Sequence, residues 1–299
     1  MKELPKIDSH FHFFDYSLHP SAVSGGGKAE SALLGDFSPL LVDYGVDDYR
    51  ADLGGHNFVK MVHEEADWDP NDPIGETRWL QGIADTHGLP HGIVGKADLA
   101  SPDLESVLEQ QCGFANFRGI RQCANWDDDP GFCLTDRPHL MREPAWRRGY
   151  PMLAKYSLSY DHNVNYHQLS EVAALMREHP DVRSVICHLG FPIHRTPEAL
   201  EVWRAGIVEV AACPNAFMKL SGITMTDHDW TTDSIRPFFL HSIDAFGPAR
   251  CMFGSNFPVD KLYGSFDRMI GAYYEILADF SDDEKQAMFH DTAAAVYRL

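Results

Sequence analysis

Eight short apolar segments, separated by stretches of helical periodicity at roughly thirty-residue spacing, are the feature that most restricts the fold. The expected strands are residues 6–14, 57–66, 92–99, 117–122, 157–164, 182–189, 216–222 and 250–256. Helices are expected over residues 73–87, 101–112, 143–155, 166–179, 197–213 and 231–246, with three more closing the chain. Strands that alternate with helices form parallel sheets, and eight such units close on themselves. The sequence therefore predicts an α/β fold, a single (β/α)8 TIM barrel that spans residues 1–299.

Two long loops interrupt this regular pattern, after the first and fourth expected strands. The first, residues 19–57, contains Ser24-Gly25-Gly26-Gly27-Lys28, but Ala29 follows where a phosphate loop needs Ser or Thr. The second, residues 125–142, carries three successive aspartates without the ligand spacing of a calcium loop. We expect the first loop to cover an active site and the aspartates to form a solvated acidic turn.

The charge balance limits the partners of the chain. Lys and Arg total 25 against 44 Asp and Glu, which gives a formal net charge of -19. Such a surface repels polyanions, so neither a nucleic acid nor a membrane is expected as a partner. The six cysteines show no C-x-x-C pairing, and the start of the chain shows no apolar signal region. These features predict a cytoplasmic protein with reduced thiols, and a homo-oligomer is left open.

The first expected strand contains a His-x-His pair, His10 and His12. Because side chains alternate along a strand, both imidazoles point the same way. Two imidazoles on one face can hold a metal ion or polarise a substrate carbonyl. The alternative is a pair of ordinary half-buried histidines.

Polar residues gather where the expected strands end, which is where a (β/α)8 barrel carries its chemistry. They are His10, His12, His63, Glu64, Glu65, Arg118, Arg121, Asp161, His162, Asn163, His188, Lys219, Ser221, Ser255 and Asn256. A substrate role is slightly favoured for Arg121, and the alternative for both Arg121 and Lys219 is a structural ion pair. The convergence of these groups predicts an active site on one rim of the barrel.

Five motifs, taken together, resemble those of a known protein family. They are Ile7-Asp8-Ser9-His10-Phe11-His12, Phe117-Arg118-Gly119-Ile120-Arg121, His188-Leu189-Gly190, Lys219-Leu220-Ser221-Gly222 and Met252-Phe253-Gly254-Ser255-Asn256-Phe257-Pro258-Val259. In this order the chain resembles the amidohydrolase-related lactonases, the amidohydrolase 2 group, which includes sugar-lactone, 2-pyrone-4,6-dicarboxylate and sulfomuconolactone hydrolases. The resemblance implies that His10, His12 and His188 surround the reacting centre, in some members with a divalent metal. It also implies a carboxylate at position 256, where this chain has Asn256.

An amide at position 256 changes the expected mechanism, because Asn256 can orient water but cannot deprotonate it. One route is a single divalent metal, for which zinc is favoured, held by His10, His12 and His188. Glu65 or Asp161 as the base is a second route. His188 as the base without any metal is a third.

The expected reaction is the hydrolysis of a small acidic lactone from sugar or aromatic catabolism. Arg118 or Arg121 would hold the anionic group, and Phe14 and Trp126 would cover the ring. Two other functions stay open: metal-dependent decarboxylation of an aromatic or unsaturated acid, and a barrel that binds its ligand without turnover.

Overall fold

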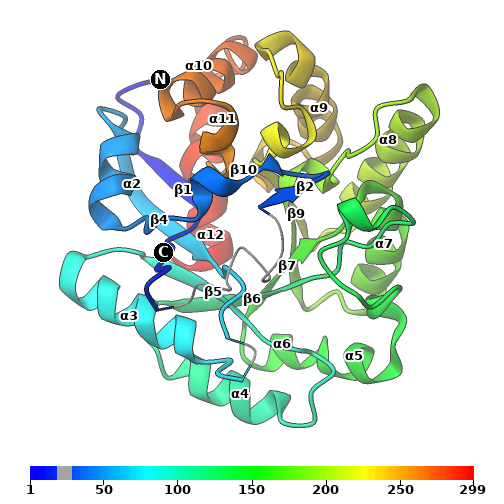
Figure 1. Cartoon of the computed structure of the whole chain (residues 1–299). Helices are drawn as coiled ribbons and strands as arrows, with labels where there is room; N and C mark the ends of the chain where they lie inside the picture. Colours follow the sequence, from blue (N-terminus) through cyan, green and yellow to red (C-terminus); the bar gives the residue numbers. More distant parts are fainter. Residues whose placement is uncertain (19–28, 70) are drawn as a thin grey trace.

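Eight parallel strands form one sheet in the computed structural model, which describes residues 1–18, 29–69 and 71–299 (Figure 1). Their order around the sheet follows the chain: β1 (Lys6–Phe11), β4 (Phe58–Glu64), β5 (Gly92–Lys96), β6 (Phe117–Cys123), β7 (Ser159–Asn163), β8 (Arg183–Ile186), β9 (Ala216–Leu220) and β10 (Cys251–Phe253). The carboxyl end of β1 and the residues that follow β10 are joined by hydrogen bonds from Asn256 N to His10 O at 2.7 Å and from His12 N to Phe257 O at 2.8 Å. The predicted (β/α)8 barrel is confirmed.

The helices surround these strands, and Figure 1 shows them in an outer ring. They are α2 (Val46–Leu53), α3 (Gly75–His87), α4 (Leu104–Cys112), α5 (Pro144–Gly149), α6 (Met152–Lys155), α7 (Leu169–Glu178), α8 (Pro197–Ala211), α9 (Thr232–Phe246), α10 (Phe266–Ile276), α11 (Asp282–Gln286) and α12 (Thr292–Tyr297). No helix in the described part of the chain has the length and apolar character needed to cross a bilayer.

The first long loop is shorter than predicted, because its last part is helix α2. Gly45 precedes the helix, its backbone N–H donates to the Asp48 carboxylate at 2.9 Å, and Tyr49 and Leu53 are buried. Only every third or fourth residue of this segment is apolar, and the sequence interpretation gave that spacing too little weight. The rest of the loop carries the short strands β2 (Glu30–Ser31) and β3 (Gly35–Asp36), while the glycine run 24–28 lies outside the described residues.

The barrel interior changes character along the strand direction. An apolar layer that includes Val62, Val185 and Met252 packs against Tyr297 of α12. Two residues after Val62, on the same face of β4, comes Glu64, which is fully buried. The charged layer above the apolar one is therefore built into the strands, and it lies directly under the rim that carries the histidines.

Candidate active site

Three imidazoles meet at the carboxyl ends of β1 and β8. The ring centroids of His10 and His188 are 4.3 Å apart, and those of His10 and His12 are 5.1 Å apart. All three side chains are buried. The structure thus brings together the His10–His12 pair of the first strand and His188, which the sequence placed at the end of the sixth.

Hydrogen bonds at Nδ1 orient His12 and His188. His12 Nδ1 lies 2.9 Å from the carbonyl oxygen of Glu64, which can only accept, so Nδ1 carries the proton and Nε2 keeps its lone pair. His188 Nδ1 lies 2.9 Å from Ser221 Oγ. Burial, then the charge of Arg121, lowers the pKa of His12 to about 3, and the same causes hold the pKa of His188 well below its usual value. Both rings are therefore neutral at physiological pH.

His10 lies between two cationic side chains. Its Nδ1 is 3.3 Å from Lys219 Nζ, and its Nε2 is 3.4 Å from Arg121 Nη1. Among the described residues, no three His, Cys, Asp or Glu side chains are placed to share one metal ion. A divalent ion on His10 would also lie beside two positive charges. As placed in this structure, His10, His12 and His188 do not fit the predicted metal site, so no step of the reaction is assigned to a metal ion here.

Lys219 completes a buried charge cluster below the histidines. Its ammonium group pairs with Glu64 and, at 2.8 Å, with Asp161, and the three side chains are fully buried. Asp161 also accepts from the Tyr297 hydroxyl at 2.5 Å. Asp161 is thus engaged inside the barrel, below the rim, and the prediction that it serves as a base there is corrected.

The guanidinium of Arg121 is paired with Glu65. Nε donates to Oε1 at 2.8 Å, and Nη2 donates to the Glu65 carbonyl oxygen. Burial alone would raise the pKa of Glu65, but the Arg121 charge holds it below its usual value. Oε2 of Glu65 also accepts from the backbone N–H of Asp67 at 3.0 Å, so both carboxylate oxygens are engaged and Glu65 is better suited to hold Arg121 than to deprotonate water.

Asn256 is fixed by a residue that the sequence interpretation missed. Its Nδ2 donates to Asp260 Oδ1 at 2.8 Å, and both side chains are buried. Asn256 also has a left-handed backbone, φ +56°, which Asn tolerates better than most residues. The spacing of four residues from Asn256 to an aspartate was the signal that could have identified Asp260.

The rim encloses a cavity of about 480 Å³, the size of a small-molecule site. Its polar and ionisable lining residues are His12, Glu65, Asp67, Lys96, Arg121, Gln122, Cys123, Thr135, Asp136, Asn163, His188 and Asn256. Its apolar wall includes the predicted Phe14, together with Leu33, Leu40, Phe191 and Met225.

Two predicted substrate contacts lie outside this cavity. Arg118 is at the amino end of β6, where Nη1 donates to the carbonyl oxygens of Ala115 and Phe117, both at 2.7 Å. The ring of Trp126 lies against that of His139, with the centroids 5.5 Å apart. Neither residue lines the cavity, so both assignments are corrected. Arg118 and Arg121 share a strand but lie near its two ends, which the motif by itself does not show.

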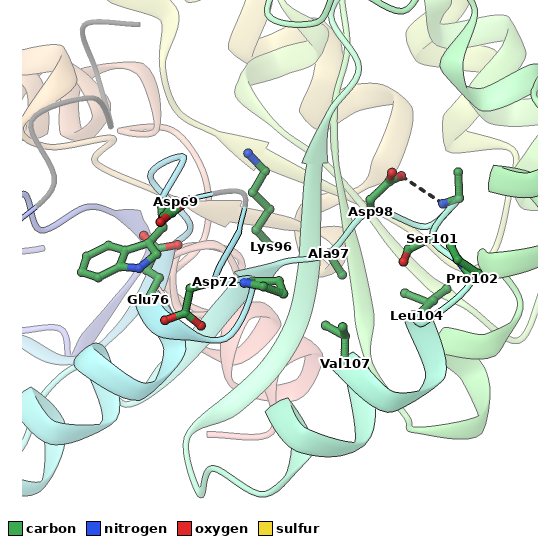
Figure 2. Close-up of a pocket in the computed structure, with 13 residues that line it drawn as sticks. Asp69, Asp72, Glu76, Lys96, Ala97, Asp98, Ser101, Pro102, Leu104 and Val107 are labelled. Atoms are coloured by element: carbon green, nitrogen blue, oxygen red, sulfur yellow. Dashed lines mark hydrogen bonds between the residues drawn. The ribbon is translucent and has the colours of Figure 1, made fainter.

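A second cavity of about 400 Å³ lies beside the first and shares Lys96 with it. Figure 2 shows Lys96 between Asp69, Asp72 and Glu76 on one side and Asp98 on the other. None of the described residues that line this cavity is a histidine. The chemistry of the first cavity, with its two neutral histidines, makes that one the candidate active site.

Comparisons with known proteins agree with this geometry. The family model described as Amidohydrolase matches residues 7–299. An uncharacterised Sinorhizobium fredii protein is 42% identical over the full length of both chains. The L-fucono-1,5-lactonase of Burkholderia multivorans is 30% identical over 310 residues, which cover 98% of this chain and 96% of that one. A crystal structure of a Burkholderia multivorans amidohydrolase with bound zinc matches with a TM-score of 0.83 and 27% identity, covering 98% of this chain and 99% of the other.

Proposed function

The chain belongs to the amidohydrolase family, and from this premise we propose that it uses water to open the ester ring of a small lactone. The observation that carries the proposal is the cavity at the carboxyl ends of the strands, where neutral His12 and His188 face the same space as the Arg121 guanidinium. Ester hydrolysis needs a proton acceptor for water and a positive group for the oxyanion, and this cavity holds both.

His12 is the better placed proton acceptor. Its Nδ1–H is held by the Glu64 carbonyl, so the Nε2 lone pair is the free position on the ring. His188 lines the same cavity and also presents a neutral ring. The attacking water would pass a proton to the imidazole while its oxygen bonds to the lactone carbonyl carbon. Arg121 would stabilise the charge that develops on the carbonyl oxygen.

The charges around the cavity favour a neutral substrate over the acidic lactone predicted from the sequence. That prediction relied on two arginines, of which Arg118 lies elsewhere and Arg121 is paired with Glu65. The other cationic group, Lys96, is paired with Asp67. With both cations paired, the cavity offers little net attraction to an anion. We therefore propose a lactone whose ring substituents are uncharged hydroxyl groups, which can donate to the carboxylates.

A related structure holds zinc, but the residues that this structure describes do not form a three-histidine donor set. His10, the third histidine, has a cationic group near each ring nitrogen, Lys219 beside Nδ1 and Arg121 beside Nε2. The proton transfers are therefore assigned to the side chains of the chain itself.

A panel of substrates tests the proposed function. Purified protein is mixed with neutral sugar lactones, acidic lactones and aromatic acids, and acid release and carbon dioxide release are both recorded. We expect acid release from neutral lactones and its loss in His12→Gln. Carbon dioxide release from the aromatic acids, without lactone hydrolysis, would contradict the proposal.

A further inference from the structure

The side-chain amide of Asn256 is held in one orientation. Its Nδ2 faces two acceptors, Asp260 Oδ1 at 2.8 Å and Met225 Sδ at 3.6 Å. Its backbone is also fixed, because Asn256 N donates to His10 O and Asp260 N donates to Asn256 O at 3.1 Å. With the NH2 group committed to Asp260, the carbonyl oxygen Oδ1 must point to the other side.

That other side is the cavity, which Asn256 and His12 both line. The Asn256 amide therefore faces the same space as the His12 ring. Since the Glu64 carbonyl takes Nδ1–H of His12, the ring presents the lone pair of Nε2. Two acceptors, Asn256 Oδ1 and His12 Nε2, thus face one region, and a molecule with two hydrogens to donate satisfies both.

We propose that Asp260 is a positioning residue that holds the Asn256 carbonyl oxygen toward His12, so that this pair of acceptors binds and orients the attacking water. The inference rests on the proposed function and deepens it. The water donates one hydrogen to each acceptor, which leaves an oxygen lone pair free to attack the lactone carbonyl.

The proposed step is balanced. The water oxygen bonds to the carbonyl carbon, one proton moves to His12 Nε2, and the bond between that carbon and the ring oxygen breaks. The proton on His12 then passes to the leaving alkoxide, so lactone plus water gives one hydroxy acid. Asn256 orients the water throughout and exchanges no proton.

The direction of the amide depends on Asp260 keeping an acceptor toward Asn256. The Thr224 side chain and the backbone N–H of Gly222 also lie at the Asp260 carboxylate, where both act to lower its pKa. A backbone N–H can only donate, so in Asp260→Asn the oxygen of the new amide would accept from Gly222. Its NH2 group would then face Asn256 and turn the Asn256 amide around. A donor would replace the acceptor beside His12.

Three variants test the proposal: Asp260→Asn, Asn256→Asp, and the double variant that exchanges the two side chains. For Asp260→Asn we expect kcat to fall about 100-fold, as for the loss of one preorganised hydrogen bond, with KM changed less than about threefold. The exchange restores one donor and one acceptor between the positions, and we expect at least a tenfold recovery of kcat over Asp260→Asn.

Asn256→Asp alone is the matched control for the carboxylate that the exchange also places at position 256. It puts two carboxylates in contact, where they must share a proton. We expect each single variant to melt about 5 °C below the wild type, and the exchange to recover most of that loss.

Two results would overturn the inference: wild-type kcat in Asp260→Asn, or an exchange variant that matches Asn256→Asp in both melting temperature and kcat. The melting measurements need no substrate. If the wild type hydrolyses no lactone, the proposed function fails. The pairing of Asn256 with Asp260 is then still supported or refuted by the melting temperatures.

Discussion

The guanidinium of Arg121 donates from Nε to Oε1 of Glu65 across 2.8 Å, and the two side chains are only 8% and 2% exposed. The two opposite charges neutralise each other at a position that little water can reach. This pair decides what the cavity can attract. Glu65 already neutralises the charge of Arg121, so the pair attracts a free anion from solution only weakly. Arg121 can still donate a hydrogen bond to the oxyanion that forms during the reaction.

Glu65→Gln is expected to change substrate preference. The amide oxygen of Gln still accepts from Arg121, but the negative charge is lost and the cavity becomes more positive. We expect the kcat/KM ratio of an acidic to a neutral lactone to rise about tenfold, equivalent to about 1.4 kcal/mol. Asp244→Asn removes the same charge from an exposed site on α9 and is the control, since solvent screens it. An unchanged ratio in Glu65→Gln would contradict the electrostatic account.

Arg118→Ala is expected to leave hydrolysis unaltered. The guanidinium bonds carbonyl oxygens at the amino end of β6, away from the cavity. We expect kcat and KM within about twofold of the wild type, measured on a neutral lactone, and only a small loss of stability. A large rise in KM would show that Arg118 reaches the substrate after all.

The sequence predicted the barrel well because the strand and helix periodicities are local properties. Ile7, Val62 and Val94 belong to apolar runs, and those runs became β1, β4 and β5. Helix α2 was missed because Val46, Tyr49 and Leu53 are isolated apolar residues in a polar segment. Their packing becomes evident only when the barrel supplies a surface for them.

The site was harder to predict, since position on a strand does not give the depth of a side chain. His10, His12 and His188 do meet. Whether a polar group at a strand end faces the cavity or the barrel interior depends on residues from other strands. Asp161 illustrates this point, because Lys219 of β9 and Tyr297 of α12 hold it inside the barrel.

Lys219→Met is expected to destabilise the protein strongly. It leaves the buried carboxylates of Glu64 and Asp161 without their shared cation. Removing one partner of a buried ion pair costs about 3–5 kcal/mol, which denaturant unfolding monitored by circular dichroism would measure. Lys261→Met is the matched control, because Lys261 is 48% exposed and pairs with Asp52 near the surface. The control should lose less than about 1 kcal/mol.

Metal removal is expected to leave the activity intact. His10 faces Lys219 and Arg121 through its two ring nitrogens, so a divalent ion there would meet two positive charges. We expect the same kcat before and after dialysis against a chelator, with elemental analysis of both samples. Activity that is lost on chelation and restored by zinc would refute this reading of His10.

Acid destabilisation is expected to depend in part on His162. Burial lowers its pKa from 6.5 to about 3, and Nδ1 has no hydrogen-bond partner among the described residues. Above pH 6.5 the imidazole is neutral in both the folded and unfolded states, so its pKa shift does not change the free energy of unfolding there. As the pH falls below 6.5, His162 is protonated in the unfolded chain but stays neutral in the folded protein until about pH 3. The free energy of unfolding therefore decreases over this range.

His162→Leu replaces this titrating group with an apolar side chain that stays buried. The Tyr150 hydroxyl, which lies 3.2 Å from His162 Nε2, keeps its contact with Ser184 Oγ at 2.6 Å. Between pH 7.5 and pH 5 the wild type should therefore lose about 2 kcal/mol more unfolding free energy than the variant. Urea unfolding at both pH values measures the difference. Equal losses in the two proteins would mean that His162 is protonated in the folded state at a much higher pH than its burial implies.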